Sequence, residues 1–237
     1  MPPKKKTASS SSSKTRATHD ADSVVATLRK LASERVRADM TKRYGIPNHN
    51  AFGVPMGKMI QLAKELGRDH ALAQSLWGTA NYEARTVAAL VDDPALVTTA
   101  QMDRWAKDFD SWAICDTVCF KLFDRVPGAL KKVQPWSKKR GEFEKRAAFA
   151  LLACVALHDK EADDAAFLKY LPLCERAASD ERNFVKKGVL WALRGIARRG
   201  PKLHAATVAV AKRLAESTEP PARWIGKSTL RELARSA

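Results

Sequence analysis

The segment DSWAICDTVCF at residues 110–120 places an aromatic ring and a carboxylate where they can act together. Trp112 and Asp116 are four residues apart, so they share one face of a helix. This pair suits a reaction that builds positive charge on a sugar, because the carboxylate stabilises an oxocarbenium-like carbon or orients a water. The same spacing fits an Asp in a salt bridge beside a core Trp, and spacing alone favours that structural interpretation.

A second chemical pattern lies in the predicted helix over residues 181–198. At 100° per residue, Lys187, Trp191, Arg194 and Arg198 fall within about 60° of one another. Cations contact phosphates while an indole packs on a sugar or base, so this stripe is suited to nucleic acid. A core Trp beside a solvated row of cations explains the pattern equally well.

Arg146 is the third candidate, at the start of the apolar run AAFALLACVAL and after the basic residues 138–140. Its guanidinium can clamp a phosphate or pair with an acid on a neighbouring helix, and the sequence leaves both open. Other catalytic motifs are missing, since the chain has no GxGxxG after a strand, no Walker loop, no HExxH and no GxSxG.

The cysteines indicate a reducing compartment and not a metal centre. A zinc site is conceivable from Cys115, Cys119, Cys154 and His158, but structural zinc sites usually use tighter knuckles on turns. We therefore predict that these three cysteines and Cys174 are buried free thiols. We expect no metal and no cofactor.

The charge of the chain points to an anionic partner. The 237 residues include 42 Lys and Arg against 26 Asp and Glu, which gives a net charge of +16. This excludes an acidic or calcium-buffering protein and favours nucleic acid or an anionic membrane surface. Since no apolar run approaches the ~20 residues of a membrane span, we expect no membrane insertion.

Residues 1–18 carry five basic residues and no acidic one. Their Ser-rich, early-Pro composition predicts a disordered tail, which we interpret as a flexible arm that adds non-specific electrostatic affinity. An organelle or nuclear signal stays open as an alternative. Residues 19–237 remain basic without the tail, and we expect them to form a single domain.

The elements that position these residues are helices. Asp22 and Ser23 can cap a helix whose apolar residues run from Val24 to Val36, and a loop follows over residues 45–55 before a helix that ends at Gly67. Hairpin signals are absent, so the prediction is all-α. Further helices are predicted over 69–79, 80–91, 98–109, 111–123, 126–134, 141–158, 161–178, 181–198, 201–216 and 220–235.

Periodicity alone does not separate an α-solenoid from a globular bundle. Short polar motifs at residues 83–85, 144–146 and 183–186 each precede an apolar run, which is a weak sign of an internal repeat.

The ordered set of segments resembles the DNA alkylation repair family of AlkD-like alkylpurine DNA glycosylases. The segments cover residues 20–235, and they are RYGIPNHNAFGVPMGKMIQLAKEL, LWGTANYEARTVAALVDDP, FDSWAICDTVC, EKRAAFALL and DERNFVKKGVLWALR. The resemblance implies an α-solenoid of HEAT-like helical repeats with a concave basic face for duplex DNA. It also implies hydrolysis of the N-glycosidic bond of cationic N3- or N7-alkylated purines, without a pocket for a flipped base.

By the same resemblance, Asp116 is the catalytic carboxylate, and Trp112 and Trp191 pack against the deoxyribose of the lesion. Arg146 would hold the DNA backbone. We also expect the cations of the stripe, Lys187, Arg194 and Arg198, to bind DNA together with Lys186 and Arg85. The chain departs from the family in the Ala-Ile-Cys between Trp112 and Asp116 and in its extra tail. Related subfamilies keep the fold but bind branched DNA without base excision.

Three functions follow from these observations. The first is an alkylpurine DNA glycosylase acting on double-stranded DNA with alkylated bases. The alternatives are a non-catalytic HEAT-like protein that binds damaged or branched DNA, and a protein-interaction scaffold. We expect a monomer in the cytoplasm, associated with the nucleoid.

Overall fold

The computed structural model describes residues 19–235, and the predicted tail at residues 1–18 lies outside them. The described part is entirely helical and contains no strand, which confirms the all-α prediction. No helix in this part has both the length and the apolar character to cross a membrane. In chain order the helices are α1 (Ala21–Lys30), α2 (Glu34–Tyr44), α3 (Met56–Leu66), α4 (His70–Gly78), α5 (Tyr82–Val91), α6 (Thr99–Lys107), α7 (Trp112–Lys121), the 3-10 helices η1 (Phe123–Arg125) and η2 (Ala129–Lys132), α8 (Val133–Trp136), α9 (Glu142–His158), α10 (Asp164–Leu168), α11 (Leu171–Ala177), α12 (Asn183–Ala197), α13 (Pro201–Ala215) and α14 (Pro220–Ala234).

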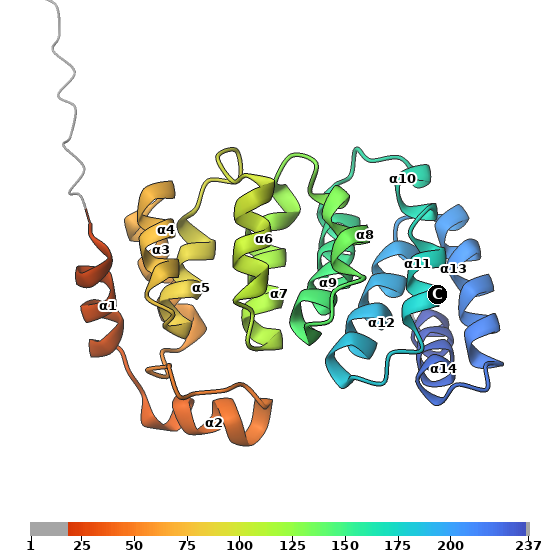
Figure 1. Ribbon diagram of the computed structural model, residues 1–237, viewed down its shortest axis with the longest axis horizontal. Coiled ribbons are helices and arrows are strands. Elements are labelled where there is room, and N and C mark those ends of the chain that lie inside the picture. The colour runs from red at the N-terminus through yellow and green to blue at the C-terminus, as the bar shows by residue number, and fades with distance from the viewer. Residues whose placement is uncertain (1–18, 236–237) are drawn as a thin grey trace, which may run out of the picture.

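The chain advances along the long axis of the molecule, from α1 at one end to α13 and α14 at the other (Figure 1). They form two layers. In one, which we call the site layer, α3, α5, α7, α9, α12 and α14 pack on one another in that order. In the second layer, α4, α8, α11 and α13 pack on α5, α9, α12 and α14 respectively. This stacking of helix pairs is a solenoid, the first of the two architectures that periodicity left open.

The first predicted helix is broken in the structure. Helix α1 begins after Asp20, whose carboxylate accepts a hydrogen bond from the Ser23 amide at 2.8 Å, so the predicted cap at Asp22–Ser23 is wrong. The apolar run to Val36 is also not one helix. Ser33 caps a new helix, α2, by accepting from the Val36 amide, and this local cap competes successfully with continuation of α1.

Two further predicted helices are divided at proline and glycine. The range 126–134 is not one α-helix, because Pro127 precedes Gly128 in the left-handed conformation with φ of +75°; η2 follows over Ala129–Lys132, and α8 begins only at Val133. The range 161–178 is split into α10 and α11, and Pro172 lies in the first turn of α11, where a missing amide costs no helical hydrogen bond.

Helix α9 is the centre of the core, with eleven consecutive buried residues from Arg146 to Ala156. Glycines on α12 let it approach α9 closely, since a Cβ at Gly195 would lie 3.2 Å from the Ala153 backbone. The prediction of buried free thiols is confirmed for all four cysteines. Within residues 19–235, no group of His, Cys, Asp and Glu is arranged to hold a metal ion.

The packing of α14 on α13 depends on Gly226, where an added Cβ would meet Ala215 N at 2.2 Å and Ala211 O at 2.6 Å. We predict that Gly226→Ala lowers the free energy of unfolding by about 1–3 kcal/mol, because backbone must move to admit the methyl group. Denaturant titration measures this loss. The matched control is Gly57→Ala on α3, where a Cβ meets nothing within 4 Å, and this change should be neutral or slightly stabilising. Equal stability of the two variants would contradict the prediction.

Candidate functional site

Helix α7, between α5 and α9 in the site layer, carries Trp112 and Asp116 with their side chains partly exposed. Ser111 caps its first turn by accepting from the Ile114 amide. Five residues of α7 are buried, namely Ala113, Ile114, Cys115, Val118 and Cys119. The other five are partly exposed, and they are Trp112, Asp116, Thr117, Phe120 and Lys121. The predicted sharing of one helix face by Trp112 and Asp116 agrees with this arrangement.

Asp116 is held by Arg146 of α9 in a two-pronged ion pair. Arg146 Nε donates to Asp116 Oδ1 at 2.8 Å and a terminal nitrogen donates to Oδ2 at 2.6 Å. The other terminal nitrogen donates to the carbonyl of Phe184 on α12 at 2.7 Å. One guanidinium therefore joins α7, α9 and α12. Of the two roles that the sequence left open for Arg146, the structure shows the pairing with an acid on a neighbouring helix.

The ion pair is buried unevenly, because the Arg146 side chain is 7% exposed and that of Asp116 is 19% exposed. Burial raises the pKa of the Asp116 carboxyl, and the bonds from Arg146 oppose that rise. The same pairing raises the pKa of Arg146 against the effect of its burial. A carboxylate with little water around it interacts strongly with any positive charge that approaches its exposed side.

Trp112 is fixed by a segment far from it in the sequence. Its indole Nε1 donates to the carbonyl of Tyr44, at the end of α2, at 2.9 Å. The ring packs against a small separate cluster made by Met40, Ile46, Ala51 and Ala113. Because the polar atom is bonded and one side is packed, the ring has a fixed orientation and remains partly exposed.

The loop that follows Tyr44 is itself held by a buried acid that sequence reasoning missed. The Glu83 carboxylate accepts hydrogen bonds from the amides of Phe52, Gly53 and Val54, at 2.7–3.1 Å. Gly53 has φ of +80° and a Cβ there would lie 2.4 Å from the Ser33 carbonyl oxygen. Glu83, the first residue of the motif at 83–85, therefore anchors this loop. The sequence indicated this role only by placing an acid at the start of an apolar helix.

Trp191 lies on α12, partly buried against the main core. The residue one turn earlier, Gly188, lies against Arg146, since a Cβ at Gly188 would be 3.5 Å from Arg146 Cγ. The turn of α12 that carries Trp191 is therefore adjacent to the partner of Asp116. Two cations of the predicted stripe are exposed, Lys187 on α12 and Arg198 at its C-terminal cap.

The other cations assigned to DNA binding have partners within the protein. Arg194 pairs with Glu232 of α14. Lys186 Nζ lies 5.3 Å from the centre of the Trp224 ring. Arg85 donates to the Asp108 carbonyl at 3.1 Å and lies over the Trp77 ring, with its side chain 13% exposed.

An ion cluster at the start of α12 was also missed by sequence reasoning. Asp180 accepts from Lys145 of α9 at 2.7 Å and from both Nε and a terminal nitrogen of Arg182 at 2.8 and 2.6 Å. These bonds hold the pKa of the Asp180 carboxyl well below its usual range. Arg182 also donates to the Arg140 carbonyl, so the cluster fixes the approach of α12 to α9.

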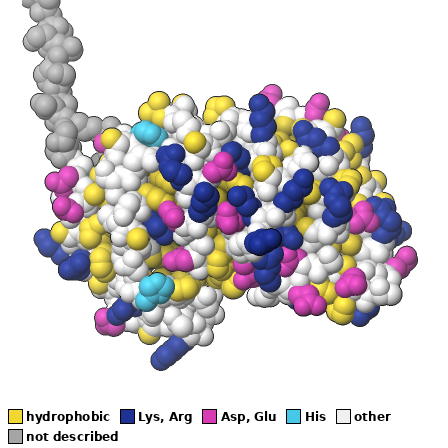
Figure 2. Space-filling model, in the orientation of Figure 1, with side chains coloured by type: hydrophobic (Ala, Val, Ile, Leu, Met, Phe, Trp, Pro, Cys, Tyr) yellow, Lys and Arg dark blue, Asp and Glu magenta, His cyan; other side chains and the backbone are white. Residues whose placement is uncertain are grey.

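Basic side chains gather over the centre and right of the face shown in Figure 2, with acidic ones between them. Together, the described residues provide a fixed carboxylate on α7, two partly exposed indoles on α7 and α12, which lie on either side of α9, and exposed cations on α12 and at its C-terminal cap. This set can stabilise a cationic carbon and hold a flat, apolar group near a polyanion.

No curated protein matches the chain. A solved structure matches with a TM-score of 0.76 and 21% sequence identity, over 92% of this chain and 95% of that one. It is described as a new family of proteins related to the HEAT-like repeat DNA glycosylases with affinity for branched DNA structures. The fold is thus the predicted solenoid of HEAT-like repeats. The family model described as DNA alkylation repair enzyme matches residues 24–223, and the chain therefore belongs to the DNA alkylation repair enzyme family.

Proposed function

We propose that the protein is an alkylpurine DNA glycosylase, which hydrolyses the N-glycosidic bond of cationic N3- or N7-alkylated purines in duplex DNA. The observation that carries the proposal is the partly exposed, desolvated Asp116 carboxylate, held by Arg146 in the site layer. The family membership supports it, because alkylated DNA is the substrate class that the family description names.

The chemistry requires few groups. An N3- or N7-alkylated purine carries a positive charge, so it leaves without protonation by the enzyme. When the bond from C1′ to the purine nitrogen breaks, its electron pair neutralises the base and C1′ becomes an oxocarbenium-like cation. Water then bonds to C1′ and loses a proton to the solvent or to Asp116. A carboxylate near C1′ stabilises the cation in this sequence.

Arg146 acts through Asp116 and is a positioning residue. By bonding both carboxylate oxygens it fixes the rotamer of Asp116 and keeps the group ionised despite its burial. Trp112 and Trp191 supply apolar faces for the deoxyribose, and Lys187 and Arg198 supply exposed charges for phosphates. Duplex DNA would lie along the site layer, with the lesion above α7.

A second candidate function is binding of branched DNA without catalysis. The matching solved structure is described by that affinity. The occupancy of both Asp116 oxygens by Arg146 also favours it, since a carboxylate in a full ion pair is less available to a substrate cation. Release of alkylated bases separates the two functions.

We predict that the wild-type protein releases 7-methylguanine or 3-methyladenine from methylated duplex DNA, and that Asp116→Asn releases it about 10²–10³-fold more slowly. The variant should still bind DNA, because the phosphate contacts lie on α12. Chromatography of the released bases and a fluorescence binding titration provide the two measurements. Since Arg146 loses a charged partner, thermal unfolding must show that the variant is folded at the assay temperature. Equal inactivity of both proteins with intact binding would support the binding function.

The raised pKa of Asp116 predicts the pH dependence of base release. The reaction needs the ionised carboxylate, so the rate should fall as the pH drops through a value above 3.8, the ordinary value for Asp. Arg146→Met removes the group that lowers this pKa, so its acidic limb should move to higher pH. Arg146→Lys should return the limb toward the wild-type position. A limb at the same pH in all three proteins would exclude this role for Arg146.

We predict that Lys187→Ala weakens binding to unmodified duplex DNA and reduces the slope of log K against log salt concentration by about 0.9, as for one lost phosphate contact. Lys202→Ala on α13 is the matched control, because Lys202 is exposed in the second layer. Its slope should equal that of the wild type. An unchanged slope for Lys187→Ala would remove Lys187 from the DNA face.

A further inference from the structure

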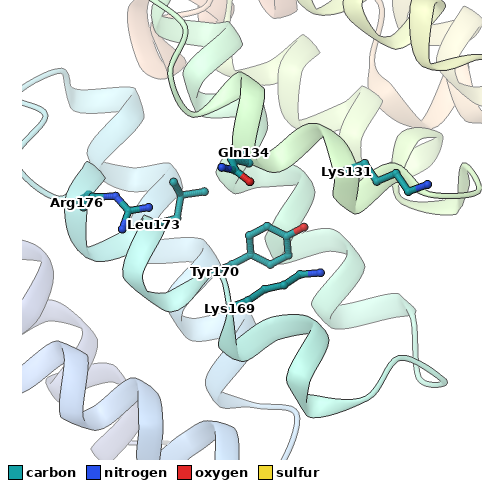
Figure 3. Close-up of a pocket in the computed structure, with 6 residues that line it drawn as sticks. All are labelled: Lys131, Gln134, Lys169, Tyr170, Leu173 and Arg176. Carbon is teal, nitrogen blue, oxygen red and sulfur yellow. The ribbon is translucent and has the colours of Figure 1, made fainter.

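A basic cavity opens in the second layer, between the segment that contains η2 and α8 and the segment that contains α11. Its volume is about 400 Å3, and it is lined by Lys131, Gln134, Lys169, Tyr170, Leu173 and Arg176. Figure 3 shows the Tyr170 ring between the two segments, with the Lys169 side chain alongside it. The size lies in the range of sites for small ligands.

The lining holds three cations and no acid, and its cations are not neutralised by the protein. Lys131, Lys169 and Arg176 are all exposed, and none takes part in an ion pair found within residues 19–235. Nearby acids are engaged elsewhere: Glu175 pairs with Arg213 of α13, and Asp103 pairs with Lys132. The cavity therefore has a positive potential that only a bound anion would balance.

The wall of the cavity is fixed by Tyr170. Its side chain is buried, and its hydroxyl donates to the Leu130 carbonyl at 2.7 Å, which ties the start of α11 to η2. Lys169 Nζ lies 5.2 Å from the centre of the Tyr170 ring. The positions of Lys131 and Lys169 relative to each other thus depend on a packed ring and not on two free loops.

We propose that this cavity is a phosphate-binding site on the layer opposite to Asp116. Arg and Lys side chains are the usual protein partners of phosphate, and three of them line this cavity, Lys131 from one segment and Lys169 and Arg176 from the other. The phosphate can come from the backbone of a second DNA segment or from a free phosphate compound. Because the cavity lies on α8 and α11, a duplex held along α7, α9 and α12 would leave it open.

The test uses the charge-reversed variant Lys131→Glu/Arg176→Glu, whose two positions are exposed and leave the core intact. In the first arm, an immobilised unmodified duplex is saturated with protein, and capture of a second, fluorescent duplex is measured. In the second arm, binding of inorganic pyrophosphate to the free protein is measured by calorimetry. The matched control, Lys202→Glu/Lys212→Glu on α13, makes the same change in net charge at two other exposed positions of the second layer.

Wild type and control should capture the second duplex or bind pyrophosphate, and the cavity variant should do so about tenfold more weakly, as for the loss of a charged contact. Loss of duplex capture identifies a second DNA segment as the source, whereas loss of pyrophosphate binding alone identifies a free phosphate compound. If the cavity variant and the control behave alike in both arms, the proposal is wrong. Release of alkylated bases is independent of this cavity, so failure here leaves the proposed glycosylase intact.

Discussion

The arrangement of the candidate site depends on one buried guanidinium. Arg146 lies on α9, begins its run of eleven consecutive buried residues, and donates to the Asp116 carboxylate on one side and to the Phe184 carbonyl on the other. A charge this deeply buried is costly unless its donors are satisfied, so α7 and α12 must be placed where their oxygens can accept. The positions of both tryptophans follow, because Trp112 is one turn from Asp116 and Trp191 is one turn from Gly188.

The close contact between α9 and α12 makes that bonding possible. Gly188 and Gly195 are two turns apart on α12, and both face α9. Gly188 lies against Arg146 and Phe149, and Gly195 lies against Ala153. With no side chains between the backbones, the Phe184 carbonyl comes within reach of Arg146. The ion cluster around Asp180 then fixes the start of α12. Packing of small residues and pairing of charges therefore support the same geometry.

Local rules in the sequence account for the helices and for which residues share a face, as with Trp112 and Asp116. They account less well for the ends of helices, because Ser33 and Pro172 change the structure within an apolar pattern that continues past them. The sequence could not predict which partners the charged residues bind. Arg146 is 30 residues from Asp116, and only the rotation of α9 against α7 decides whether it meets that acid or a phosphate. Glu83, in turn, serves a loop some 30 residues earlier.

The hydrogen bond from Trp112 to Tyr44 bears on how far this architecture is modular. Repeat solenoids are often treated as chains of units in which each unit senses only its neighbours. Here the indole of α7 takes its orientation from a carbonyl 68 residues earlier, at the end of α2. A graft of α7 to α12 onto another solenoid would transfer the ion pair and the glycine contacts but leave that indole without its acceptor. The portable unit for protein engineering must therefore include α2 and its loop.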